Sequence, residues 1–481
     1  MKKLLPLLIS AAIGTVSTSS WAENLTEIYN QAKKNDPTLL SSAATRDSTV
    51  EAVNSKRATL LPQLSLDNTL GATRGDASGS DTDYNNWSSK LTFSQKLYDR
   101  ASWIDLTTAE KTARKADATY AAAQQDLIMR TATAYFDVLK AKDNLAFVQA
   151  EKASVGRQLE QTKQRFDVGL SAITDVQNAQ ADYDSVLASE ITAKNDLVNS
   201  YEGLREITGQ EPSHLAVLDT KRFSASKLPQ TLTQLLDEAK KKNLSLLAAR
   251  ITQDIARDNI SEQSAGHLPT LSATSTYSKG ETFDGNPSSA NNTTGQFYAG
   301  LDLKVPIYSG GSVNSATKQA EYDYIAASQD LESTYRTVVA NVRAYYNNVN
   351  ASIGSIQAYE QSVVSAKSSL EATEAGFEVG TRTIVDVLNA TQSLYEANEN
   401  LADARYTYIL NVLQLKEYVG ILSEQDVLDI NAGLESATKA AQQKLAAEKA
   451  AKAKAAKTTT HKKSLYTTIC CANINQKKVI Y

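Results

Sequence analysis

The sequence predicts a mixed α and β protein in which one unit, a pair of amphipathic strands followed by very long helices, occurs twice. Three observations support this prediction: a direct internal repeat, a switch from period two to helical patterning in each copy, and long stretches without proline. The chain has 481 residues, a net charge of −4 and a mean hydropathy of −0.36. This charge gives no indication of nucleic-acid binding.

Residues 1–22 are predicted to be a secretory signal peptide. Two lysines precede the apolar residues 4–16, and small residues around Ala22 provide a cleavage site. An uncleaved anchor helix is the alternative, but the apolar run is shorter than the ~20 residues that cross a bilayer. We therefore expect an exported protein whose mature chain begins at Glu23.

The body of the chain repeats itself at a spacing of about 210 residues. Residues 61–64 (LPQL) return as residues 268–271 (LPTL), and residues 166–169 (FDVG) return as residues 377–380 (FEVG). A direct duplication means that both copies should adopt the same supersecondary structure. The predicted organisation is a signal peptide (1–22), a first repeat (23–228), a second repeat (229–430) and a tail (431–481).

Each repeat is predicted to contain long helices, at about 101–206 and 313–420. Neither segment contains a proline within its helices, and both are rich in good helix formers. Gly169 and Gly380 mark the points where each helical segment reverses direction. The apolar residues of these helices are few and have small side chains, which is typical of coiled-coil packing. An ordinary filamentous coiled coil is the alternative.

The residues ahead of each helical segment alternate with period two. Alternate residues from Phe297 to Val305 are apolar, whereas Asp302 and Lys304 lie on the opposite face. One face therefore suits lipid and the other water, over the 9–11 residues that a membrane strand requires. A soluble four-stranded sandwich is the alternative, but it would bury Lys and Asp. The predicted strands are residues 62–73, 87–98, 268–279 and 296–306.

Four strands cannot close a membrane barrel, because the smallest bacterial barrels contain eight. The strands of several chains must therefore combine, and oligomerisation is expected to be obligatory.

The tail, residues 431–481, is an Ala/Lys-rich low-complexity segment that is expected to be disordered. Cys470 and Cys471 are interpreted as an incidental pair rather than a metal site or a disulfide framework. The three histidines are scattered, and no nucleophile motif, metal cluster or nucleotide loop is recognisable. The sequence therefore predicts no enzyme, no metal and no cofactor.

Several stretches closely resemble the TolC family of outer-membrane efflux proteins. They include residues 131–136 (TATAYF), 172–179 (AITDVQNA) and 379–387 (VGTRTIVDV), and the resemblance extends over about residues 23–430. It implies a homotrimer with a shared 12-stranded β-barrel in the Gram-negative outer membrane, four strands per chain. The barrel would continue into a periplasmic α-helical coiled-coil tunnel.

The resemblance also implies a function and partners. The chain would be a passive exit duct for tripartite multidrug efflux pumps and type I protein secretion, opened at its periplasmic helical tip. Its partners would be a periplasmic adaptor (membrane fusion) protein and an inner-membrane RND, MFS or ABC transporter. A dedicated type I secretion channel is an alternative, and a periplasmic coiled-coil structural or adhesin protein is a weaker one.

Asp386 and Asn389 are the candidate selectivity residues of the entrance. They lie three residues apart and share one helix face, so a trimer would present three carboxylates near three amides. Such a ring favours cations. The alternative is a solvated carboxylate at a helix start, stabilised by the helix dipole. The resemblance favours the ring.

The resemblance further implies a latch between two helical hairpins at the tip. Arg382 would pair with Thr174 and Asp175, and Gln158 would pair with Glu374. Exposed pairs of this kind contribute only ~0–1 kcal/mol each, which suits a latch that must open.

Two residues depart from the family pattern. Asn389 stands where a second aspartate is usual, which predicts weaker cation block. Phe377 stands where a tyrosine is usual, which removes a hydroxyl that could bind Asp175 and predicts a looser latch. The two repeats also differ from each other, because Arg382 of the second copy corresponds to Ser171 of the first. This asymmetry marks Arg382 as the leading candidate for the gate.

Overall fold

The structure is a computed structural model, and it describes most of the chain between the two ends. The described residues are 23–77, 80–81, 83–212, 215–220, 223–283 and 292–435. The predicted signal peptide and the tail beyond residue 435, with Cys470 and Cys471, lie outside the described residues.

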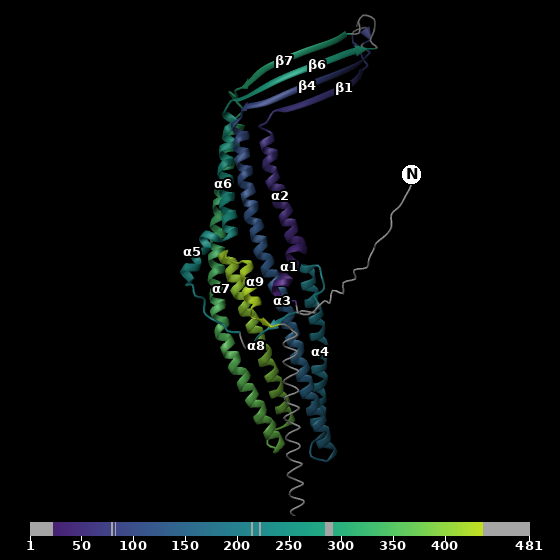
Figure 1. The fold of residues 1–481 in the computed structure, drawn as a ribbon, viewed down its shortest axis with the longest axis vertical. Coiled ribbons are helices and arrows are strands. Elements are labelled where there is room, and N and C mark those ends of the chain that lie inside the picture. Colours follow the sequence, from purple (N-terminus) through teal and green to yellow (C-terminus); the bar gives the residue numbers. More distant parts are fainter. Residues whose placement is uncertain are drawn as a thin grey trace, which may run out of the picture.

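The two repeats have the same order of elements, and their four strands form a sheet at one end of an elongated stack of helices (Figure 1). The first repeat contains α1 (Leu25–Asn35), α2 (Pro37–Ala58), β1 (Gln63–Thr73), β4 (Tyr84–Tyr98), α3 (Arg100–Asp167) and α4 (Ile173–Thr208). The second contains α5 (Leu232–Lys242), α6 (Leu244–Ser264), β6 (Thr270–Phe283), β7 (Asn292–Lys304), α7 (Ser312–Glu378) and α8 (Ile384–Val419). The short strands β2 (Asp76–Ala77) and β3 (Ser80–Asp81) pair between β1 and β4.

Corresponding helices of the two repeats have nearly the same length. α3 and α7 contain 68 and 67 residues, and α4 and α8 contain 36 each. At 1.5 Å per residue, α3 and α7 each extend for about 100 Å. None of the described helices is long and apolar enough to cross a membrane.

Four shorter helices precede the strands, and the sequence patterns did not predict them. Capping boxes begin α1 at Asn24 and α5 at Thr231. The side chains of Asp36 and Asn243 cap α2 and α6 by accepting the backbone N–H three residues ahead, at 2.8 and 2.9 Å. These caps were readable in the sequence, because Asn, Asp and Thr at such positions satisfy N–H groups that a helix leaves unpaired.

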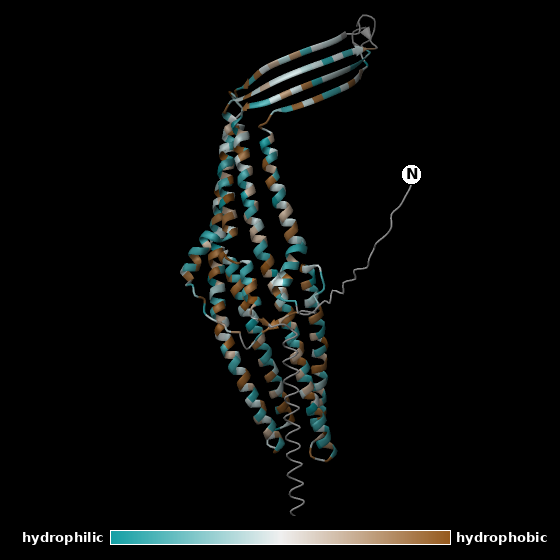
Figure 2. Cartoon of the chain, viewed as in Figure 1, coloured by the Kyte–Doolittle hydropathy of each residue, from teal (hydrophilic) through white to brown (hydrophobic). Residues whose placement is uncertain are grey.

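The main sheet is antiparallel throughout, in the order β1-β4-β6-β7. One row of cross-strand neighbours is Leu66, Leu91, Tyr277 and Phe297. The next row is Asp67, Lys90, Ser278 and Gln296. The sheet therefore has one apolar and one polar face, and Figure 2 shows the alternation along the strands.

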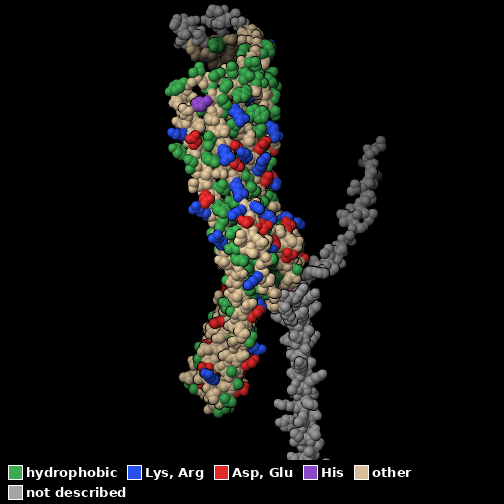
Figure 3. Space-filling model, turned by 90° about the vertical axis from the view of Figure 1, so that its left-hand side faces the viewer, with side chains coloured by type: hydrophobic (Ala, Val, Ile, Leu, Met, Phe, Trp, Pro, Cys, Tyr) green, Lys and Arg blue, Asp and Glu red, His purple; other side chains and the backbone are tan. Residues whose placement is uncertain are grey.

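The sheet is open at both edges and on its apolar face. Within the described chain, β1 and β7 each have a single neighbour in this sheet. Leu66 and Phe297 on the apolar face remain 62% and 70% exposed. Figure 3 shows hydrophobic side chains gathered over the sheet end, with charged ones below. Long edges of this kind pair with other strands, so the sheet is built to combine with further copies.

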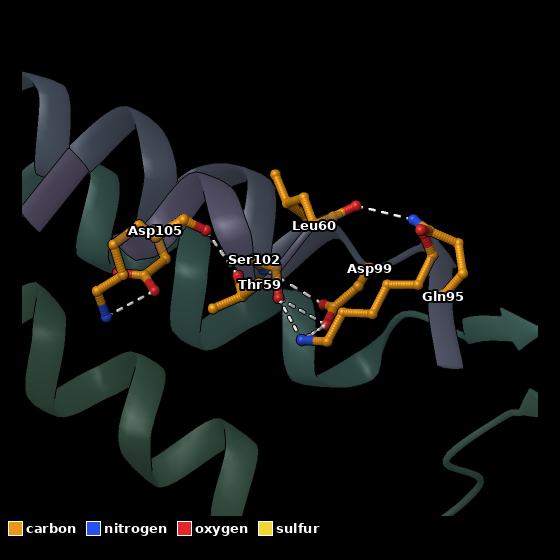
Figure 4. A network of polar contacts seen from close by, with 8 residues as sticks. Thr59, Leu60, Gln95, Asp99, Ser102 and Asp105 are labelled. Carbon is orange, nitrogen blue, oxygen red and sulfur yellow. Dashed lines mark hydrogen bonds and ion pairs between the residues drawn. The ribbon is translucent and has the colours of Figure 1, made fainter. Parts of the chain in front are cut away.

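The first strand pair passes into α3 through a polar junction, shown in Figure 4. Asp99 is the N-cap of α3, where it accepts a hydrogen bond from the Ser102 N–H at 3.3 Å and pairs with Lys96 at 2.9 Å. Gln95 donates to the carbonyl of Leu60 at 2.8 Å. The Asp99 contacts join β4 to α3, and the Gln95 bond holds the end of β4 against the segment that leads into β1.

The largest apolar core lies midway along the helices. Tyr135 and Phe136 of α3 are 0% and 1% exposed, and their rings meet edge to face at 5.7 Å. The Tyr135 hydroxyl donates to the carbonyl of Ala216 at 2.7 Å. Tyr406 of α8 packs on Phe136 at 5.7 Å and so joins the two repeats.

The fold extends a few residues into the segment that the sequence assigned to the tail. α9 (Glu424–Asn431) is followed by β8 (Leu434–Glu435), which pairs with β5 (Val217–Leu218). The predicted start of the tail at residue 431 is therefore corrected to a point after Glu435. The sequence did not reveal this extension of the fold, because a two-residue strand has no detectable period.

Asp36 provides a test of how the short helices are anchored. It is 2% exposed and accepts two hydrogen bonds from Arg130, at 3.1 and 2.8 Å. The guanidinium of Arg130 lowers the pKa of this carboxyl. Asp36→Asn should reduce the free energy of unfolding by about 1–3 kcal/mol, because it removes the buried charge that faces Arg130 while Arg130 keeps its contact with Asp126 at 2.7 Å. Thermal unfolding followed by circular dichroism at pH 7 would measure the change.

The depressed pKa of Asp36 also sets the direction of the pH dependence. Its stabilisation is present above the usual carboxyl pKa and is lost as the pH falls through the lowered value, that is, below about pH 4. Asp47→Asn is the control, since Asp47 is 65% exposed and pairs with the adjacent Arg46. An Asp36→Asn protein as stable as this control at pH 7 would contradict the assignment.

Candidate functional site

The two long hairpins turn at the end of the molecule opposite the sheet (Figure 1). α3 passes into α4 through Gly169, and α7 passes into α8 through Gly380, with φ angles of +77° and +78°. A side chain would be strained in this conformation, which explains the glycine in each copy. We call the two turns and the adjacent ends of these four helices the tip.

Asp386 lies in the first turn of α8, where it completes a capping box. Its Oδ2 accepts hydrogen bonds from the backbone N–H and the hydroxyl of Thr383, both at 2.9 Å. These bonds from Thr383, with a smaller contribution from the charge of Arg382, lower the pKa of the Asp386 carboxyl. Asn389 is exposed one turn further along the helix. Asp386 therefore remains ionised at neutral pH and is positioned by its own helix.

Asp175 occupies the corresponding position at the start of α4. Its Oδ2 accepts hydrogen bonds from the Ser171 hydroxyl at 2.8 Å and from the Ala172 N–H at 3.2 Å. The helix-start interpretation considered for Asp386 thus describes the contacts of both aspartates within one chain. It does not conflict with a ring at the bore, because all of these bonds use one oxygen of each carboxylate.

The residues of the predicted Arg382 latch are not brought into contact within one chain. Arg382 is exposed, and among the described residues it forms no ion pair with Asp175. Its backbone N–H donates to the carbonyl of Gly376 at 3.2 Å. Thr174 is also exposed. The side chains of Arg382 and Thr174 are both accessible at the tip.

Gln158 has a different partner from the predicted one. Its Nε2 donates to the hydroxyl of Thr391 on α8 at 3.0 Å, and both residues are buried. No hydrogen bond joins Gln158 to Glu374 in the described part of the chain. Instead, both residues line a cavity of about 230 Å³ between the hairpins. The physical reason is burial: Glu374 is exposed and can be hydrated, whereas the Gln158 amide is buried and its N–H group needs a partner inside the protein.

Phe377 contacts a residue that the sequence patterns did not single out. The guanidinium of Arg165 lies over the Phe377 ring at 4.6 Å from the ring centre. Arg165 follows Gln158 by seven residues, so both lie on the face of α3 that meets the second hairpin. This spacing could have predicted that Arg165 faces the second hairpin, whereas no sequence pattern indicated the contact of Thr391.

A small apolar cluster holds the hairpins together near the tip. It consists of Val155, Leu159, Ala179, Ile384, Val387 and Leu388, all buried. Phe377 packs against it and is partly exposed. The cluster is much smaller than the core around Tyr135 and Phe136, so the hairpins are joined less firmly here.

An acidic groove of about 590 Å³ lies between α3, α4 and α8, further from the tip. The carboxylates that line it are Glu151, Asp182, Asp196, Glu396 and Glu399. Burial raises the pKa of Glu151, and the charges of Glu396, Glu399 and Asp182 add to the effect. Burial also raises the pKa of Asp182. The sequence did not reveal this groove, because its residues come from three helices.

Comparison with known proteins relates this fold to a family. The chain matches the family described as "Outer membrane efflux protein" over residues 28–210 and 235–421, one match in each repeat. It is 62% identical over 443 residues to outer membrane protein TolC of Vibrio cholerae, covering 91% of this chain and 100% of that protein. The protein of the same name from Escherichia coli strain K12 is 48% identical over 456 residues, covering 93% and 92%.

More distant proteins have a similar length or fold. The alkaline protease secretion protein AprF of Pseudomonas aeruginosa is 29% identical over 460 residues, covering 92% of this chain and 94% of that protein. The outer membrane channel CmeC of Campylobacter jejuni superposes with a TM-score of 0.71 at 15% identity, covering 85% and 89%. VceC of Vibrio cholerae gives 0.67 at 19% identity, covering 82% and 96%. Since both repeats match the family and the similarity extends over nearly the whole chain, this chain belongs to the outer membrane efflux proteins.

Proposed function

We propose that this chain is the outer-membrane exit duct of tripartite efflux pumps and of type I protein secretion, and that it opens at its periplasmic tip. The observation that carries the proposal is the 62% identity to outer membrane protein TolC along its full length. The family transports substrates and does not transform them. The apolar sheet face belongs in the outer membrane, and the helices extend into the periplasm.

The duct requires partners. A homotrimer supplies the strands that one chain lacks, since three sheets of four strands close one barrel. Energy comes from an inner-membrane RND, MFS or ABC transporter, and a periplasmic adaptor protein links that transporter to the tip. A dedicated secretion channel is the second candidate, favoured by the 29% identity to a protein named for alkaline protease secretion.

Removal of the gene tests both candidates. An exit duct shared between pumps predicts that a deletion strain loses resistance to several unrelated antibiotics and also fails to secrete a type I substrate. Loss of secretion alone would favour the dedicated channel. Full retention of both functions would contradict the proposal, and a protein absent from the outer-membrane fraction would favour a periplasmic stalk.

The bore at the tip is proposed to be lined by Asp386. This carboxylate lies in the first turn of α8, and its lowered pKa keeps it charged at neutral pH. Three copies around a threefold axis form a ring of negative charge that favours cations. Asn389 adds amides to the ring and no charge.

Asn389→Asp should convert one ring of carboxylates into two. Block of single channels by a trivalent cation should then require about tenfold less cation, because three charges are added close to the first ring. Asn178→Asp is the matched control, since Asn178 occupies the corresponding position of the other hairpin and adds the same charge. Unchanged block in Asn389→Asp, or equal enhancement in both variants, would contradict a bore at Asp386 and Asn389.

Arg382 is proposed to hold the closed tip by reaching Thr174 and Asp175 across the gap between hairpins. The exposure of Arg382 and Thr174 supports this role, and Glu374 at the rim of the tip cavity is a further partner available to the latch. Such a contact is weak, because water competes for each charge.

Arg382→Ser replaces this residue by its counterpart in the first repeat. If Arg382 holds the latch, the fraction of time that a single channel spends in its open state should rise by up to about fivefold. Planar-bilayer recordings would measure the change, and Arg336→Ser is the control because Arg336 lies on α7 far from the tip and pairs with Glu332 of its own helix. An open fraction equal to that of the control would remove Arg382 from the latch.

A further inference from the structure

We propose that the stacking of Arg165 on Phe377 is the polar contact that ties the two hairpins together closest to the turns of each chain, in addition to the apolar cluster. This inference rests on the proposed function, because it concerns how the closed entrance is held. It assigns a positioning role to Arg165, which lies outside the Arg382 latch. It also gives Phe377 a role that does not require a hydroxyl group.

The geometry of α3 supports this role. Gln158 and Arg165 are seven residues apart on one face of α3, and each reaches a different helix of the second hairpin. Gln158 bonds Thr391 of α8 at 3.0 Å, and Arg165 lies over the ring of Phe377 of α7 at 4.6 Å. α3 therefore contacts both helices of the opposite hairpin. The Arg165 contact is the one closer to the turn.

Apart from the bond between Gln158 and Thr391, the polar contacts that the structure describes between the hairpins are distant from the tip. In the part of the chain that the structure describes, the nearest ion pair between them joins Lys140 to Asp403 at 2.6 Å. Lys140 precedes Arg165 by about seven helical turns. Asp175 and Asp386 cap their own helices and do not cross between the hairpins. Beyond Gln158, the Arg165 contact is thus the polar link between the last turns of α3 and the second hairpin in the described chain.

The packing around Phe377 makes this contact more important. Phe377 lines the cavity of about 230 Å³ that separates α3 from α7 and α8. Atoms that border a cavity lose dispersion contacts on that side, so apolar packing alone holds this region weakly. A guanidinium is suited to compensate, because its flat surface stacks on an aromatic ring and is less strongly hydrated than an ammonium group.

The test is a set of substitutions on both sides of the contact, studied as purified full-length trimers in planar bilayers. Arg165→Gln and Phe377→Leu should each raise the fraction of time that the trimeric channel spends in the open state by about two- to fivefold. The double variant should open no more than either single variant, because both remove the same contact. Phe377→Tyr, which keeps the ring, should not raise the open fraction above that of the original protein.

Lys163→Gln is the matched control. Lys163 is two residues from Arg165 and carries the same charge, but it approaches Gln180 of its own hairpin, at 3.4 Å. This substitution should leave the open fraction unchanged, and each variant should retain the heat-modifiable mobility of an intact trimer. Should Arg165→Gln fail to assemble, Phe377→Leu tests the same contact from α7.

The possible failures are distinguishable. Equal open fractions for Arg165→Gln, Phe377→Leu and Lys163→Gln would overturn the inference while leaving an active channel. Additive effects in the double variant would also overturn it, since the two residues would then act separately. If the original protein formed no channels at all, the proposed function itself would be wrong.

Discussion

The unpaired edges of the four-stranded sheet are the constraint on which the rest of the structure depends. β1 and β7 are edge strands of 11 and 13 residues with backbone N–H and C=O groups left unpaired on their outer sides, and no other described residues cover the apolar face beside them. Backbone N–H and C=O groups cannot remain unpaired in lipid. Closing the sheet into a ring with other copies pairs the backbone groups of both edges, because β7 of one chain can pair with β1 of the next. The ring then fixes where the long helices begin.

Equal helix lengths carry the symmetry of the ring to the opposite end. α3 and α7 differ by one residue and α4 and α8 have the same length, so both hairpins turn at nearly the same level. The duplication therefore places six turns of a trimer near one plane, where small differences between repeats can act. One such difference is Arg382 of the second repeat, which corresponds to Ser171 of the first. Another is the contact of Phe377, which stacks with Arg165 of the other hairpin.

The sequence predicted the strands and the long hairpins because their signals are local. Period two, long segments without proline and a repeated glycine each report on a few neighbouring residues, and the helices and strands indeed lie where these signals occur. The short helices α1 and α5 escaped because 11 residues contain few periods, although their capping boxes were present. The partners of Gln158 and Arg165 could not be predicted, because they depend on how α3 is rotated against α7 and α8.

The distribution of packing and charge explains why opening would begin at the tip. Midway along the helices, Tyr135 and Phe136 are almost completely buried and Tyr406 joins the repeats, so separation there would expose a large apolar area. Towards the tip, apolar contacts are few and the acidic groove places Glu151 and Asp182 opposite carboxylates of α8. Like charges across this groove favour separation of the hairpins, and the contacts of Gln158 and Arg165 oppose it. The closed tip is then a balance of weak opposing contributions that a small change in free energy can shift, while the middle of the molecule remains intact.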